Sequence, residues 1–358
     1  MNEEKVSDQV LSEKIYVGID VHAKSYAVTV VCEGRATKKW SMPAENENLV
    51  AKLQRDYSNC TIYTVYEAGF SGFVLHRALE KAGINNVVVH AAGIAISSGD
   101  RVKTDRRDSE KLATLLSKGM LKGVRIPSLE EELKRQLNRL RQQLMKERTR
   151  FMLQIRRRLY HFGYGLDLDG VLQRRQVREL LDGLPASELK LCVESQLRLW
   201  EALERELREI NKLLSQQAAQ CPYEEMYRSL PGIGRVSARI LANELGDMQQ
   251  FRNEKALFCF VGLTPTEHSS GEHIRRGHIS RQGNGTLRKI LVEAAWVAIR
   301  NDVGLKRYYS RLAARAGGKR AIVAVARKLI GRARAVFRTG EFYRVTEESQ
   351  QLAVSLAA

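Results

Sequence analysis

Apolar residues recur at intervals of three and four in two stretches near the middle of this chain, and a helix places that spacing on one face. The first stretch begins after Pro127 with a capping box, in which Ser128 is the N-cap and Glu131 the third helical residue. Its apolar positions are Leu133, Leu137, Leu140 and Leu144. Those of the second stretch are Val193, Leu197, Trp200, Leu203, Leu207, Ile210 and Leu214. We therefore expect two long helices in a helical coiled-coil region over residues 126–220, separated by residues 163–185.

This pattern is equally compatible with an ordinary bundle of helices within one chain and with a coiled coil between chains. Heptads this short do not decide the oligomeric state. The two helices do divide the chain, because the sequences on either side of them have a different character.

Strands and helices alternate in the region before the long helices, within a domain that we place at residues 1–125. Runs rich in β-branched residues predict strands at Ile15–Asp20, Tyr26–Cys32, Thr37–Met42, Thr61–Tyr66 and Asn86–His90. Helical patterns cover Glu47–Tyr57, Phe73–Lys81 and Asp105–Lys118. This order of elements predicts a mixed α/β sheet.

The region after the long helices, residues 221–345, is rich in Gly and Arg and mainly helical, and a tail of residues 346–358 follows it. Helices are expected at Val236–Leu245, Leu287–Arg300, Lys306–Ala316 and Arg320–Arg338. The fold class is therefore α/β plus all-α.

Positive charge is concentrated near the end of the chain. The 358 residues contain 59 Lys and Arg against 41 Asp and Glu, a formal net charge of +18. Residues 271–340 hold 17 basic and 3 acidic residues, hence +14 of that total. A polyanion, most simply nucleic acid, is the expected partner, and a solvated basic face is the alternative.

Membrane and secreted proteins fit this sequence poorly. No apolar run approaches the roughly 18 residues that cross a bilayer, and the first thirteen residues do not have the character of a signal peptide. The five cysteines, Cys32, Cys60, Cys192, Cys221 and Cys259, form no CxxC pair. We expect free thiols in a reducing cytoplasm.

Four acids occupy positions from which they could share a metal ion. Asp20 ends the first strand, Glu67 ends a later one, and Asp105 and Asp108 open a helix three residues apart, on one face. Strand ends and a helix start can meet at one rim of a sheet. Carboxylates are the ligands of Mg²⁺, and a metal pair about 4 Å apart can stabilise both oxygens of a phosphodiester displacement. Each acid alone could instead be structural, Asp105 for example as a helix cap.

Two glycine-rich segments could contact phosphates. Gly232 and Gly234 in Pro231-Gly232-Ile233-Gly234 precede a helix and resemble half of a helix-hairpin-helix. Residues 262–284 form a hydroxyl-rich loop among arginines, in which a serine could attack phosphorus or merely bind phosphate. The expected nucleic-acid contacts are Gly232, Gly234, Arg275, Arg276, Arg281, Arg288 and Lys289. His268, His273 and His278 are five residues apart, which fits neither a helix face nor a strand face, so we do not expect them to bind zinc.

These segments in this order resemble the DEDD transposases, or bridge-RNA-guided recombinases, of insertion-sequence family one-hundred-ten. The resemblance spans nearly the whole chain. It rests on Tyr16-Val17-Gly18-Ile19-Asp20, Tyr66-Glu67-Ala68-Gly69, Lys103-Thr104-Asp105-Arg106-Arg107-Asp108, Leu230–Gly234, Gly262–Pro265, Ser270-Gly271 and the residues from Ile279-Ser280 to Gly283-Asn284. Ser109 stands where the family more often has Ala.

The resemblance implies a RuvC-like (ribonuclease H fold) N-terminal domain, with Mg²⁺ on Asp20, Glu67, Asp105 and Asp108, and a C-terminal transposase domain whose nucleophile maps to Ser270, with Ser269 adjacent. It implies double-stranded DNA as substrate, a noncoding guide RNA, and a homodimer that becomes a tetramer in the synaptic complex. The expected location is the prokaryotic cytoplasm, associated with the nucleoid. The alternatives are a metal-dependent nuclease or junction resolvase that uses water, and a non-enzymatic basic DNA-binding protein.

Overall fold

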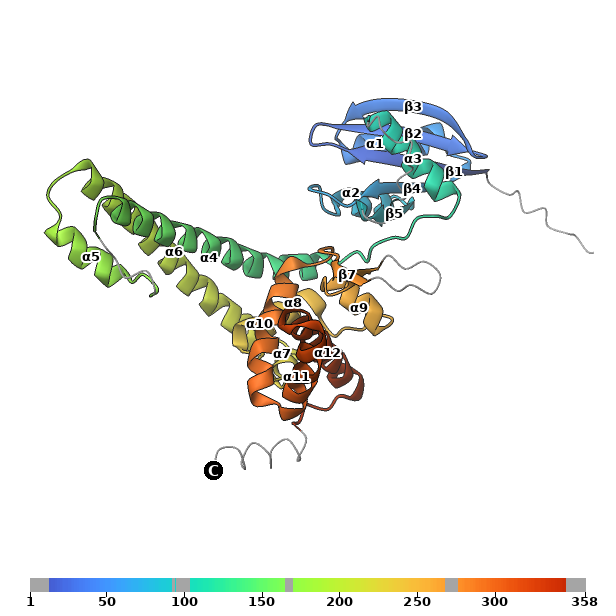
Figure 1. The fold of residues 1–358 in the computed structure, drawn as a ribbon. Helices are drawn as coiled ribbons and strands as arrows, with labels where there is room; N and C mark the ends of the chain where they lie inside the picture. The colour runs from blue at the N-terminus through green and yellow to red at the C-terminus, as the bar shows by residue number, and fades with distance from the viewer. Residues whose placement is uncertain (1–12, 92–93, 95–103, 165–169, 268–275, 346–358) are drawn as a thin grey trace, which may run out of the picture. The chain divides into compact units, whose positions relative to one another are not determined.

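The computed structural model describes residues 13–91, 94, 104–164, 170–267 and 276–345. The chain divides into two compact units, Met1–Ile126 and Pro127–Ala358. Figure 1 shows a sheet with its helices in the first unit, and a long helical hairpin joined to a bundle of helices in the second.

The first unit is built on a five-stranded mixed sheet with the order β3-β2-β1-β4-β5. Its strands are β1 (Glu13–Val21), β2 (Ser25–Cys32), β3 (Arg35–Pro43), β4 (Cys60–Glu67) and β5 (Asn85–Val89). The first three strands are antiparallel neighbours, whereas β4 runs parallel to β1 and to β5. The mixed α/β architecture expected from the sequence is confirmed.

Helices cover both faces of this sheet. Helices α1 (Asn46–Asp56) and α2 (Val74–Lys81) pack with Ile15, Val17 and Ile19 of β1 in one apolar core. Helix α3 (Asp105–Ser117) packs on the opposite face, where Leu112 contacts Val65 and Val89. Because side chains alternate along a strand, the even-numbered residues of β1 face α3.

Gly18 lets α3 lie directly on β1. A Cβ atom at Gly18 would stand 1.9 Å from the backbone oxygen of Ser109 and 2.6 Å from the nitrogen of Ala113. Only a residue without a side chain permits this approach. The contact fixes how closely the second and third turns of α3 lie against the strand.

Ser109 also makes a buried hydrogen bond under α3. Its Oγ lies 2.8 Å from Oγ1 of Thr29 on β2, and both residues are fully buried. The buried hydroxyl of Ser109 is therefore matched by a hydroxyl on the neighbouring strand.

We expect Ser109→Ala to destabilise the first unit by about 1–3 kcal/mol, because the Thr29 hydroxyl then loses this buried partner. In a double-mutant cycle, Thr29→Val with Ser109→Ala should cost less than the two single changes summed. Hydrogen exchange of the β2 and α3 amides measures the change in stability of each variant. Strict additivity would show that the two hydroxyls do not interact.

The second unit begins with the expected pair of long helices. Helix α4 (Leu129–His161) starts at the capping box of Ser128 and Glu131, and α6 (Glu188–Ala219) runs back along it. The antiparallel pairing is marked by contacts of Gln154 with Gln196, Arg148 with Glu204 and Arg141 with Asn211. A short helix, α5 (Arg174–Gly183), lies between them in sequence and was not predicted.

The apolar stripes of the two long helices differ in burial. Those of α6 are buried as expected, except that Leu203 is half-buried. On α4, however, Leu133 is 61% and Leu140 42% exposed, while the polar residue Asn138 is fully buried. Within the described chain these two leucines are not covered, because α4 turns a polar face towards α8.

The rest of the second unit is a helical bundle with one small hairpin of strands. Its elements are α7 (Glu224–Arg228), α8 (Arg235–Leu245), α9 (Glu254–Phe260), β6 (Pro265–Glu267), β7 (Arg276–Ile279), α10 (Gly285–Asn301), α11 (Val303–Ala316) and α12 (Gly318–Thr339). A large apolar core unites them. In the described part of the chain, no helix combines the length and the apolar character that crossing a bilayer requires.

Candidate functional site

Three side chains of the first unit converge on one point. His22 Nε2 lies 3.2 Å from Oδ2 of Asp20 and also 3.2 Å from Oδ2 of Asp105. One ligand atom from each residue falls within 4.8 Å of the other two. His22 Nε2 is shielded from solvent, and both of its close polar neighbours are carboxylate oxygens.

The local sequence explains this convergence. The alternation of β1 directs Asp20 to one face of the sheet, and His22 comes directly after the strand, which ends at Val21, with its ring beside Asp20. That face is the one covered by α3, whose first turn carries Asp105. Gly18, two residues before Asp20, sets the close approach of helix and strand.

Glu67 and Asp108 belong to the strand and the helix that border this cluster. The parallel register pairs Ile19 with Tyr66, so Asp20 and Glu67 are the next residues along their strands. Val65 packs against Leu112 of α3, and Glu67 therefore belongs to the α3 face as well. Asp108 follows Asp105 in the first turn of α3, and its charge acts on Asp20. Neither residue supplies an atom to the three-residue cluster.

The electrostatics of the cluster favour a cation. Burial raises the pKa of the Asp20 carboxyl above its ordinary value. His22 opposes the shift, whereas the charges of Asp105 and Asp108 add to it. Crowded carboxylates resist ionising together unless a positive charge is near. The donor set of two carboxylates and one buried imidazole nitrogen therefore fits a divalent metal ion.

A second group of expected site residues lies around the β6–β7 hairpin of the second unit. Ser269 and Ser270, between its strands, lie outside the described residues, as do His268, His273 and Arg275. The base of the hairpin is described and tightly packed. A Cβ at Gly283 would stand 2.4 Å from the oxygen of Cys259, and one at Gly262 would stand 2.5 Å from the oxygen of Gln282.

The residues expected to contact nucleic acid occupy different surroundings. Arg281 and Lys289 are exposed, and Arg276 belongs to β7. Arg288 donates to the carbonyl oxygens of Gly262 and Gln282, at 3.2 and 3.4 Å, and so ties the hairpin base to α10.

The two glycines of the Pro231–Gly234 turn also differ. Gly232 has φ +82° and lies against α10, where a Cβ would stand 2.2 Å from the oxygen of Ala294. Gly234 is the exposed N-cap residue of α8, with open space around its Cα. Internal packing accounts for the first glycine, and the second leaves the start of α8 accessible.

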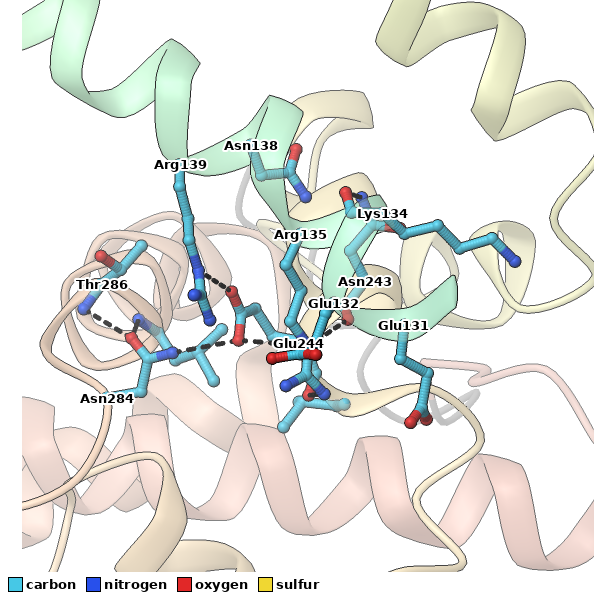
Figure 2. A network of polar contacts seen from close by, with 12 residues as sticks. Glu131, Glu132, Lys134, Arg135, Asn138, Arg139, Asn243, Glu244, Asn284 and Thr286 are labelled. Atoms are coloured by element: carbon cyan, nitrogen blue, oxygen red, sulfur yellow. Dashed lines mark hydrogen bonds and ion pairs between the residues drawn. The ribbon is translucent and has the colours of Figure 1, made fainter. Parts of the chain in front are cut away.

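A buried carboxylate links the hairpin base to the long helix α4 (Figure 2). The carboxylate of Glu244 in α8 forms ion pairs with Arg139 at 3.4 Å and with Arg135 at 3.8 Å. It also accepts a hydrogen bond from the side-chain amide of Asn284 at 3.4 Å. The side-chain oxygen of Asn284 caps α10 by accepting from Thr286 N and Leu287 N. No sequence pattern signals this network, since Glu244 occurs in an ordinary helix.

Comparison with known proteins assigns the chain to a family. A putative transposase of Sinorhizobium fredii, y4qE, is 31% identical over 288 residues, which are 78% of this chain and 71% of the relative. The chain belongs to the IS116/IS110/IS902 family of transposases. The family model described as Transposase IS116/IS110/IS902 family matches residues 224–310, and a DEDD transposase family model matches residues 17–162.

Other relatives agree with this assignment. The putative transposase y4rJ of Sinorhizobium fredii is 31% identical over 74% of each chain. The transposase for insertion sequence element IS1111A of Coxiella burnetii is 29% identical over 63% of this chain and 64% of its own. As a transposase, the protein acts on DNA, and the match to the DEDD family spans Asp20, Glu67, Asp105 and Asp108.

Proposed function

We propose that this transposase exchanges DNA strands by phosphodiester transesterification, using a RuvC-like first unit whose acids hold Mg²⁺. The observation that carries the proposal is the meeting of Asp20 and Asp105 at one point, with Glu67 and Asp108 on the same face. When bound there, Mg²⁺ supplies Lewis-acid stabilisation of charge on the scissile phosphate. Asp20, Glu67, Asp105 and Asp108 orient that phosphate by fixing the cation.

Ser270 is the proposed nucleophile. Its Oγ attacks phosphorus and forms a phosphoserine bond while the bond from phosphorus to the DNA 3′ oxygen breaks, and the hydroxyl proton leaves as the 3′ oxygen gains one. The energy of the broken ester is kept in the new one, so that a 3′-hydroxyl of the partner strand can reverse the step. The basic segment 271–340 holds the DNA, and its charge of +14 suits a phosphate backbone.

Trapping the covalent intermediate tests the chemistry. Incubation with labelled DNA ends and Mg²⁺ should yield a protein–DNA adduct that resists denaturant and disappears in Ser270→Ala but persists in Ser269→Ala. Nicked DNA without any adduct would instead indicate a nuclease or junction resolvase that uses water. Cleavage that survives Asp105→Asn would remove the metal site from the mechanism, and absence of any cleavage by the wild-type protein would favour a DNA-binding protein without activity.

The target is proposed to be chosen by base pairing of a noncoding bridge RNA, which the basic segment can hold through its phosphates. Copurified RNA of defined sequence, whose replacement redirects integration, would support guidance. Integration at an unchanged target after that replacement would contradict it.

The proposed assembly is a homodimer that pairs into a tetramer when DNA ends meet, with α4 as the dimer contact. The exposed leucines Leu133 and Leu140 are the support for this surface, because apolar side chains at helical spacing gain by being covered. Asp20→Ala chains mixed with Ser270→Ala chains should recover activity if each site takes residues from two protomers.

We expect Leu133→Glu with Leu140→Glu to lower the oligomeric state while leaving the fold intact, since both side chains are already exposed. Light scattering after size exclusion measures the mass. The matched control is Leu153→Glu, another exposed leucine of the same helix (53%) that is outside this stripe. A dimer that persists in the double variant would place the contact elsewhere.

A further inference from the structure

We infer that His22 is a protein ligand of the metal ion, in addition to the carboxylates, and that it shifts the site's preference towards Mn²⁺. This inference rests on the proposed metal site and adds a nitrogen donor to it. The observation behind it is the position of His22 Nε2, equidistant from a carboxylate oxygen of Asp20 and one of Asp105.

The spacing of the three atoms is that of ligands around a single cation. Neighbouring ligands of an octahedral ion with bonds of 2.0–2.1 Å are about 3.0 Å apart, and opposite ligands about 4.2 Å apart. The structure has two separations of 3.2 Å and all three atoms within 4.8 Å. A small shift of the three side chains towards one another would let all three atoms bind one ion.

The state of the nitrogen also suits a ligand. His22 Nε2 is buried although the side chain as a whole is 44% exposed, and it faces one carboxylate oxygen of Asp20 and one of Asp105. A shielded imidazole nitrogen beside two carboxylate oxygens is placed to share a cation with them. The backbone holds the residue in place, since His22 N donates to Ser25 O at 2.9 Å and closes the turn after β1.

The kind of donor determines the kind of ion. Carboxylate oxygens suit Mg²⁺, Ca²⁺ and Mn²⁺ alike, whereas imidazole binds the transition metals more strongly than it binds hard cations. A set of two carboxylates and one imidazole therefore favours Mn²⁺ over Mg²⁺.

Binding of Mn²⁺ to the full chain, followed by electron paramagnetic resonance, tests this ligand directly. We expect His22→Ala to weaken Mn²⁺ binding about tenfold or more. Removing a residue that only hydrogen-bonds to a metal ligand already lowers metal affinity by about that factor. The affinity for Ca²⁺, measured by its competition with Mn²⁺, should change less in this variant. Pulsed spectra of the wild-type complex should show coupling to a directly bound ¹⁴N that His22→Ala removes and His161→Ala, in the second unit, retains.

The outcomes separate this inference from the proposed function. If Mn²⁺ binds and is lost in Asp105→Asn, but shows no ¹⁴N coupling, the carboxylate site stands and His22 is not a ligand. If His22→Ala binds Mn²⁺ more tightly, the imidazole is a cation that competes with the metal, and the inference is overturned. If the wild-type chain binds no divalent ion, the proposed metal site fails as well. A melting temperature of metal-free His22→Ala close to that of the wild type excludes misfolding as the cause.

Discussion

Gly18→Ala is expected to displace α3 from the sheet and so to disrupt the proposed metal site. The added methyl would stand 1.9 Å from the backbone oxygen of Ser109, and real Cβ contacts essentially never fall below 3.0 Å, so helix and strand must separate by more than 1 Å. Overpacking against rigid backbone costs about 3 kcal/mol or more at its upper end. Hydrogen exchange of β1 and α3 amides should rise accordingly.

The same displacement has a chemical consequence. Asp105 lies on α3 and Asp20 on β1, so a shift between the two elements pulls the ligand atoms apart. Misplacement of reacting groups by about 1 Å can cost 10²-fold in rate. We expect Gly18→Ala to lose Mn²⁺ binding and about 100-fold in DNA cleavage.

Gly69→Ala is the matched control, since the heavy atom nearest to a Cβ at Gly69 would be 3.9 Å away and the φ of this residue is not positive. It should change stability by no more than about 0.5 kcal/mol. Equal stability of the two alanine variants would mean that α3 does not rest on β1 at Gly18.

The architecture of the first unit followed from its sequence because local and tertiary signals agree there. The β-branched runs of β1, β2 and β4 are buried strands, and the paired acids at Asp105 and Asp108 do open α3. His22 was missed because it follows the strand and looks like part of a polar turn. Its position just after the strand that ends in Asp20 and Val21 was the available signal.

The second unit shows where a repeat alone is insufficient. The spacing on α4 correctly predicted a helix, but it did not predict which side of the helix would be buried. Asn138 is buried because its amide reaches the carbonyl of Arg239 in α8 at 3.5 Å, a contact between residues 101 positions apart. Helix α5 was not predicted because only Val177 and Leu181 mark its buried face, and two apolar positions are too few to indicate a helical period.

Glu244→Leu is expected to destabilise the second unit by about 3–5 kcal/mol, the cost of removing one partner of a buried ion pair. Glu244 is 7% and Arg135 12% exposed at the side chain, so the guanidinium would remain poorly solvated with its counter-charge gone. Glu293→Leu is the control. Its pair with Lys289 spans 3.7 Å between side chains that are 64% and 76% exposed, and such pairs contribute about 0–1 kcal/mol.

The loss at Glu244 should also reach the serine-bearing hairpin. Asn284 ends the hairpin base and caps α10, and its side-chain amide would lose Glu244 as a hydrogen-bond acceptor. The attachment of the hairpin would therefore loosen. We expect faster hydrogen exchange at the start of α10 and less covalent adduct. Mn²⁺ binding, which depends on side chains of the first unit, should stay at the wild-type level.

Glu244→Gln separates the two roles of this carboxylate. The amide oxygen can still accept from Asn284, but it carries no charge for Arg135 and Arg139. If positioning of Asn284 controls the hairpin, Glu244→Gln should recover more adduct than Glu244→Leu at a similar loss of stability. Equal adduct from both variants would show that the charge and not the hydrogen bond connects α4 to the hairpin base.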